Sequence, residues 1–200
     1  MTVTDDSPPS ASASANVAAS ASATPSAEGL AAAATQAAKK GPPPVHLWNP
    51  PFCGDLDIEI RADGTWFYLG TPIGREALVR LFASILKVED GRFYLVTPVE
   101  KVGIRVADAP FIAVDFHAEG RDLVFTTNVG DRVTAGPDHA IRVTEDPETG
   151  EPRPYLHIRR GLEARIDRKS FYRLAEMAQA QGGRMVVTSG GADFDIGPAA

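Results

Sequence analysis

Basic side chains concentrate in one segment of this 200-residue chain, between Arg153 and Arg173. Against two acidic residues, the segment holds seven basic ones: Arg153, Arg159, Arg160, Arg165, Arg168, Lys169 and Arg173. In a protein of net charge −6 this is a local positive patch, which favours an acidic partner or a phosphate group. The other interpretation is that the strands simply point these side chains at water, where arginine is common.

Two arginines, Arg75 and Arg168, fall in the first turns of the two helices that apolar spacing predicts. A cation there opposes the positive end of the helix dipole, at a cost of a few tenths to about 1 kcal/mol. Each arginine therefore needs an anionic partner. One hypothesis is a small anionic ligand held by arginine and free helix N–H groups. The residues assigned to that ligand are Arg168, Arg165, Lys169, Arg173 and Arg75.

The alternative hypothesis is an ion pair between each arginine and a carboxylate of its own half of the fold. We favour this pairing for Arg75, because the preceding hairpin supplies Asp57 and Glu59. For Arg168 the ligand hypothesis stays open, since neighbouring basic residues compete for the few acids nearby. Those neighbours are Arg165, Lys169 and Arg173.

A second group of residues has the side-chain types of acid–base catalysis. Glu100, Asp131 and His139 occur in neighbouring segments, and an enzyme would bring them into one pocket. Asn128 and Asp131 are also ordinary turn formers, which is the interpretation we favour. The chain has no G-x-S-x-G nucleophile motif and no glycine-rich phosphate loop.

Metal and cofactor chemistry has little support in the sequence. The single cysteine, Cys53, excludes an internal disulfide and a multi-cysteine metal site. The four histidines are scattered, and Asp115 with His117 gives only two ligands on one strand face. We therefore expect no metal and no cofactor.

The elements that must position these residues follow from hydrophobic periodicity. Leu56, Ile58 and Ile60 alternate as in a strand, Asp63-Gly64 turns the chain, and a helix is expected over about 75–87. The later segment repeats the order, with strands over 155–158 and 162–166 around a glycine. A second helix is expected over about 168–180, capped by Asp167. Alternating strands fill the region between, with Ile112, Val114 and Phe116 predicted to face inward.

The two strand–strand–helix segments also resemble each other in sequence at an offset of 93 residues. Ile73, Arg75 and Leu81 align with Ile166, Arg168 and Leu174. We therefore expect an α+β fold of antiparallel strands with two related β-β-α units, about 54–87 and 150–180. In that fold Ile73 would superpose on Ile166, and Leu81 on Leu174.

The N-terminal segment has a different composition. Residues 1–41 contain 14 Ala and 7 Ser and no aromatic residue, which is too little apolar surface to offset the entropy of ordering. We expect residues 1–44 to be a disordered leader with a proline linker, and 45–197 to be one α+β domain. Residues 28–40 favour a helix but have only Leu30 as a sizeable apolar residue, so the helix is expected to have nothing to dock against.

The overall charge and hydropathy exclude two classes of partner. The net charge of −6 argues against general nucleic-acid binding, and no apolar run is long enough for a membrane helix. The first charged residues are Asp5 and Asp6, unlike a signal peptide, so we expect a cytoplasmic protein.

Several distinctive segments resemble a bacterial family, domain-of-unknown-function family 1285. The resemblance spans about residues 45–196 and rests on the following segments: Gly54–Ile58, Asp63–Arg75, Tyr94–Lys101, Asp108–Phe111, Thr127–Val133, His139 and Gly161–Ala164. It implies an α+β fold with repeated structural motifs and a part in bacterial signal transduction. The family has no established enzymatic activity or cofactor, so the resemblance supplies no catalytic residues.

Taken together, these patterns predict a binding module without enzymatic activity, which recognises a protein partner or a small anionic ligand. The alternative is a hydrolase-like enzyme that uses carboxylate and histidine groups. A concave pocket containing Glu100, Asp131 and His139 would favour the enzyme, whereas a groove or an exposed apolar patch would favour the binding module.

Overall fold

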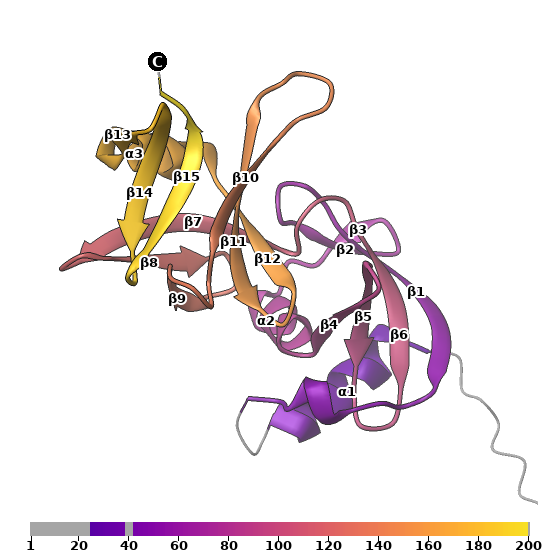
Figure 1. The fold of residues 1–200 in the computed structure, drawn as a ribbon. Coiled ribbons are helices and arrows are strands. Elements are labelled where there is room, and N and C mark those ends of the chain that lie inside the picture. Colours follow the sequence, from indigo (N-terminus) through magenta and orange to yellow (C-terminus); the bar gives the residue numbers. More distant parts are fainter. Residues whose placement is uncertain (1–24, 39–41, 200) are drawn as a thin grey trace, which may run out of the picture.

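The computed structural model describes residues 25–38 and 42–199 (Figure 1). Strands in this part of the chain build two six-stranded sheets and one three-stranded sheet, with three α-helices packed against them. Most neighbouring strands are antiparallel, so the α+β class expected from the sequence is confirmed.

The first sheet has the strand order β3-β2-β1-β6-β5-β4. Its strands are β1 (Phe52–Ile60), β2 (Trp66–Tyr68), β3 (Thr71–Pro72), β4 (Leu86–Glu89), β5 (Arg92–Val96) and β6 (Lys101–Val106). β1 and β6 run parallel at the centre. The alternation predicted for β1 is confirmed, because Leu56, Ile58 and Ile60 are all buried.

The second sheet has the order β10-β11-β12-β7-β8-β9. Its strands are β7 (Phe111–Glu119), β8 (Asp122–Thr127), β9 (Arg132–Thr134), β10 (Ile141–Glu145), β11 (Pro152–Arg159) and β12 (Leu162–Ile166). β7 and β12 run parallel at the centre. The two sheets therefore share one topology, in which the first and last strands of each sheet meet in the middle.

The repeat is thus a whole sheet, and it confirms the expectation of repeated units. Both β-β-α segments also exist, but their hairpins differ in order. The central strand comes first in β1–β2 and second in β11–β12. Ile73 consequently follows an edge strand, whereas Ile166 ends a central one, so the predicted superposition of these two residues is wrong. Similar apolar spacing in two helices produced the match.

The helices α2 (Glu76–Ser84) and α3 (Arg168–Met177) are shorter than the sequence predicted. α2 ends early because Leu86 and Lys87 pair with β5 instead of continuing the helix. The fully buried apolar side chain of α2 is Phe82, which stacks on Trp66, while that of α3 is Leu174.

The inward face of β7 also differs from the prediction. Phe111, Ala113 and Phe116 are buried, whereas Val114 is exposed. The pairing with β8 shifts register between Ala113 and Asp115, which marks a β-bulge. A bulge adds one residue to one strand, so the alternation changes phase at that point.

A third sheet completes the C-terminal part with β13 (Gln179–Gln181), β14 (Arg184–Ser189) and β15 (Ala192–Pro198). β15 is ordered because it pairs with β14 along its length. The turn of this hairpin docks on the second sheet through the buried hydroxyl of Ser189.

The N-terminal segment contains a helix, α1 (Ala27–Ala38), followed by a short 3₁₀ helix, η1 (Val45–Leu47). Residues 1–24 and 39–41 of the expected leader lie outside the described residues. The expectation that the helical segment has nothing to dock against is wrong, because Ala27, Leu30 and Ala34 are buried where α1 packs on α2. Within the described chain, no helix is both long and apolar enough to cross a membrane.

Candidate functional site

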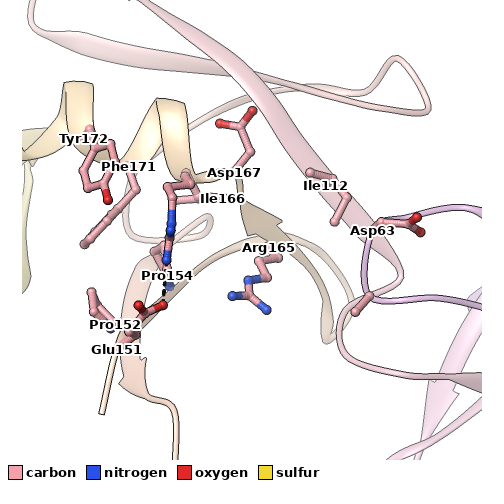
Figure 2. A pocket seen from close by; sticks show the side chains of 12 residues that line it. Asp63, Ile112, Glu151, Pro152, Pro154, Arg165, Ile166, Asp167, Phe171 and Tyr172 are labelled. Carbon is pink, nitrogen blue, oxygen red and sulfur yellow. Dashed lines mark hydrogen bonds and ion pairs between the residues drawn. The ribbon is translucent and has the colours of Figure 1, made fainter. Parts of the chain in front are cut away.

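A cavity of about 420 Å³ opens where the start of α3 faces the loop between β10 and β11 and the turn between β1 and β2. Figure 2 shows Phe171 and Tyr172 on one side of this cavity and Asp63 and Ile112 on the other. Its lining is Ala62, Asp63, Ile112, Glu151, Pro152, Pro154, Arg165, Ile166, Asp167, Arg168, Phe171 and Tyr172. We call this space the interdomain cavity, since both six-stranded halves line it.

Asp167 fixes the start of α3 at the cavity, as the sequence predicted. Its carboxylate accepts a hydrogen bond of 2.7 Å from the backbone N–H of Ser170. The first amides of a helix have no acceptor within the helix, so those of Arg168 and Lys169 stay available there. The Asp167 cap therefore uses one amide and leaves two for another acceptor.

Arg168 lines the cavity and pairs with Glu151, with 2.6 Å between Nη2 and Oε2. Of the two hypotheses left open for Arg168, the ion pair with a carboxylate is therefore the one that the structure contains, with Glu151 as the partner. Glu151 comes from the loop between β10 and β11, whose position depends on the folded hairpin. The two side chains are 68% and 60% exposed, and such surface pairs contribute only about 0.2–1 kcal/mol.

Arg165 is held more firmly than Arg168. Its Nη1 lies 2.9 Å from Oδ2 of Asp108, a carboxylate that is only 13% exposed. The Tyr155 hydroxyl donates a 2.6 Å hydrogen bond to the other oxygen of Asp108. Burial, together with this hydrogen bond, raises the pKa of Tyr155. Because a guanidinium has five N–H donors, Arg165 keeps donors for a further partner.

The rest of the cavity wall combines apolar surface with negative charge. Phe171, Tyr172 and Ile112 supply apolar surface, and Tyr172 is 59% exposed at the rim. Asp63 adds a carboxylate whose pKa is lowered by the hydrogen bond from the backbone N–H of Thr65. The lining therefore contains two guanidinium groups and three carboxylates, with Glu151 and Asp167 completing the set.

Lys169 and Arg173, the other two candidates on α3, do not line this cavity. Arg173 pairs with Asp115, donates to the carbonyl of Phe116 at 2.7 Å and lies over the ring of that phenylalanine. The hydrogen bond from Arg173 is the main cause of the lowered pKa of Asp115, and Lys169 contributes through its charge. Arg173 and Lys169 therefore interact with Asp115 of β7 and do not contribute to the interdomain cavity.

Arg75 lies apart from the cavity, at the N-cap of α2. The expected ion pair with Asp57 or Glu59 is wrong, because both carboxylates face Arg105 on the neighbouring strand β6. No carboxylate among residues 25–38 and 42–199 pairs with Arg75, whose side chain is exposed. The sequence did not predict that β6 would pair with β1. Arg105 of β6 therefore pairs with the acidic side chains of β1 in place of Arg75.

The positive patch between Arg153 and Arg173 is largely neutralised. Arg153 pairs with Asp146 and Arg159 with Asp131, in addition to the three pairs described above. The acidic partners come from other segments of the chain. A count of charges restricted to residues 153–173 therefore does not include them.

The candidate catalytic residues are not gathered in one place. Asp131 lines a groove with Arg159, to which it pairs at 2.5 Å, and neither Glu100 nor His139 lines that groove. His139 bonds through Nδ1 to the carbonyl of His157. Among the residues that the structure describes, no cluster of three His, Cys, Asp or Glu side chains would hold a metal ion.

Sequence reasoning missed most of the cavity wall, including Glu151 and Asp63. Both lie in segments whose sequence predicts turns, and only the tertiary structure places them near α3. Tyr172 had a usable signal, since it follows Arg168 by four residues and so shares its side of the helix.

Family models match two consecutive parts of the chain. Residues 43–109 match "Domain of unknown function (DUF1285), N-terminal domain", and residues 110–196 match "Protein of unknown function (DUF1285), C-terminal domain". The boundary falls between β6 and β7, so each matched domain contains one six-stranded sheet. No curated protein matches the chain.

Two crystal structures of proteins from the same family resemble this fold. The one from Silicibacter pomeroyi DSS-3 has 59% identity and a TM-score of 0.78, over 84% of this chain and 94% of that chain. The one from Shewanella baltica OS155 has 32% identity and a TM-score of 0.50, over 60% of this chain and 91% of that chain.

Proposed function

The chain belongs to the DUF1285 family, and we propose that it is a binding module that takes a small anionic ligand in the interdomain cavity. The observation that carries this proposal is the meeting of Arg165 and Arg168 beside the first amides of α3 in one cavity. Backbone N–H groups and guanidinium donors at a helix start are a favourable setting for an anionic group.

In this proposal Glu151 occupies the place of the ligand's anionic group. Its carboxylate binds Arg168 at the surface, where an ion pair is weak. A ligand carboxylate or phosphate offers the same oxygen acceptors and adds contacts that Glu151 does not make. Arg165 keeps its position when the ligand replaces Glu151, because it is paired with Asp108. Asp108 is itself positioned by the hydrogen bond from Tyr155.

The lining also defines the class of ligand. Three carboxylates around two guanidinium groups disfavour a polyanion, so a single negative charge fits best. Phe171, Tyr172 and Ile112 favour an apolar body attached to that charge. We therefore propose a monoanionic ligand with an apolar portion, such as an aromatic or aliphatic carboxylic acid.

The place of the cavity supports a role in signal transduction. Ala62 and Asp63 belong to the first matched domain, while α3 belongs to the second. A ligand that touches both would stabilise one arrangement of the two domains over others, which is how a bound molecule becomes a signal. Signalling and a cytoplasmic location are part of the proposal.

Sodium benzoate is a suitable probe, because it joins one carboxylate to an apolar ring. Isothermal titration of the full chain is expected to show benzoate binding, which Arg168→Gln weakens at least fivefold. Arg121→Gln, an exposed arginine outside the cavity, is the matched control and should bind benzoate like the wild type. Equal benzoate binding by the wild type and Arg168→Gln, or none by the wild type, would contradict the proposal.

A further inference from the structure

α1 covers an apolar groove on α2, but it fills this groove with small side chains. Only Leu30 among its buried residues is larger than alanine, the others being Ala27 and Ala34. A helix of twelve residues is marginal by itself in water, so α1 depends on this docking for its structure. The contact that holds α1 in place therefore depends on one large side chain, Leu30.

The space between α1 and α2 is incompletely filled. A groove of about 590 Å³, open on one side, is lined by residues of both helices. On the α1 side its lining includes Ala31 and Thr35, and on the other side it consists of residues between Tyr68 and Phe82, Leu78 and Leu81 among them. Small residues thus face large apolar ones, and bigger side chains in place of Ala31 and Thr35 would contact that wall.

The groove also carries a charge without a partner. Arg75 lines it at the start of α2, and no carboxylate in the described chain pairs with its guanidinium. Glu28 of α1 lines the same groove without forming that ion pair. A better-fitting occupant would carry a carboxylate placed to reach Arg75.

We propose that this groove is a docking site for an amphipathic helix of a partner protein, and that α1 is its weak intramolecular occupant. The partner helix carries Leu, Ile or Met at positions i and i+4, and a carboxylate that pairs with Arg75. The groove residues from Tyr68 to Phe82 lie inside the matched N-terminal domain, whereas α1 precedes it. The groove is thus part of the matched N-terminal domain, whereas α1, which covers it, lies in the segment before that domain.

A labelled peptide tests the proposal on the full chain. The probe has the sequence of residues 25–38 with Ala31→Leu and Thr35→Leu, and its binding is followed by fluorescence anisotropy. Tethered α1 competes at a high effective concentration, so the wild type is expected to bind the probe weakly. Ala34→Glu places a charge at a buried position of α1 and should tighten probe binding at least tenfold. Gln36→Glu, which adds the same charge at an exposed position, should leave it unchanged.

Arg75→Gln in the Ala34→Glu background should weaken probe binding two- to fivefold. Equal probe binding by the wild type and Ala34→Glu, or none by either, would overturn the proposal. If Ala34→Glu does not fold, Ala31→Leu with Thr35→Leu in the full chain decides. These changes should raise the melting temperature and weaken probe binding at least fivefold, and a lower melting temperature would show that the groove does not accept larger side chains.

Discussion

The side-chain nitrogen of Asn128 lies 3.4 Å from the carbonyl oxygen of Gly64, and this contact joins the two sheets. The side-chain oxygen of the same asparagine accepts the backbone N–H of Ile112 at 3.0 Å. Asn128 thus ties the β1–β2 turn to β7 at the edge of the interdomain cavity. The contact positions Asp63 and Ile112, which form one wall of that cavity.

Gly64→Ala should destabilise the protein because this contact leaves no room for a side chain. Gly64 has φ +82°, and a Cβ there would lie 2.6 Å from Ile112 and 2.8 Å from Asn128. Backbone strain and overpacking together predict a loss of about 2–4 kcal/mol in urea unfolding. Gly91→Ala is the control, since its φ is +75° but its surroundings are open, and it should cost only about 1 kcal/mol. Equal losses for the two variants would contradict the close approach.

Ser189→Ala should cost about 1–3 kcal/mol in the free energy of unfolding. The buried hydroxyl accepts the N–H of Leu123 and donates to the carbonyl of Ala135, both at 2.8 Å, so its removal leaves two buried groups unpaired. Thr188→Ala removes the neighbouring, exposed hydroxyl and should cost less than half as much. Similar losses for both would show that the β14–β15 hairpin is not held by Ser189.

Leu30→Ala should lower the free energy of unfolding by about 2 kcal/mol, through the loss of buried apolar surface. This replaces the expectation that the N-terminal segment has nothing to dock against. Gln36→Ala changes an exposed residue of the same helix and should stay within about 0.5 kcal/mol of the wild type. Chemical denaturation of both variants measures the difference, and an unchanged Leu30→Ala would mean that α1 does not contribute to stability.

Glu89 should contribute to the loss of stability in acid. Hydrogen bonds from Lys101 and then Lys87 lower the pKa of Glu89 below its ordinary value of 4.5. A lowered pKa in the folded state means that the stabilisation is complete above about pH 4.5 and is lost as the pH falls through the folded value. Glu89→Gln should therefore unfold with a shallower pH dependence between pH 5 and pH 3. Glu76→Gln, which removes an exposed carboxylate from the pair with Arg80, is the control for the loss of one negative charge.

The sequence predicted local structure where neighbouring residues determine it. The alternation of β1 and the Asp167 cap both depend on residues within a few positions of one another, and both are confirmed. Which residues of β7 face inward could not be predicted in this way, because the bulge after Ala113 depends on pairing with β8. The central β1–β6 and β7–β12 pairs join distant segments, so periodicity alone did not reveal the sheet-level repeat.

The candidate site was predictable only in part for the same reason. Arg165 and Arg168 are adjacent on β12 and at the start of α3, so their placement together follows from the local strand–helix order. Their partners Asp108 and Glu151 arrive through tertiary structure. The ion pair expected for Arg75 is therefore wrong within the described ranges, whereas Arg168, for which pairing was left open, has a carboxylate partner.

The competition between Glu151 and an anionic ligand for Arg168 is the most direct measurement of the proposed function. Glu151→Gln removes the competing carboxylate and keeps the shape of the side chain, so benzoate should bind about 1.5- to 5-fold more tightly, as expected for losing a surface ion pair. Glu148→Gln, in the same loop and with the same change in charge, controls for the general effect of charge. Isothermal titration of the two variants and the wild type gives the three dissociation constants. Tighter benzoate binding by Glu151→Gln alone is the predicted result, and unchanged or weaker binding by Glu151→Gln would contradict an anion site at Arg168.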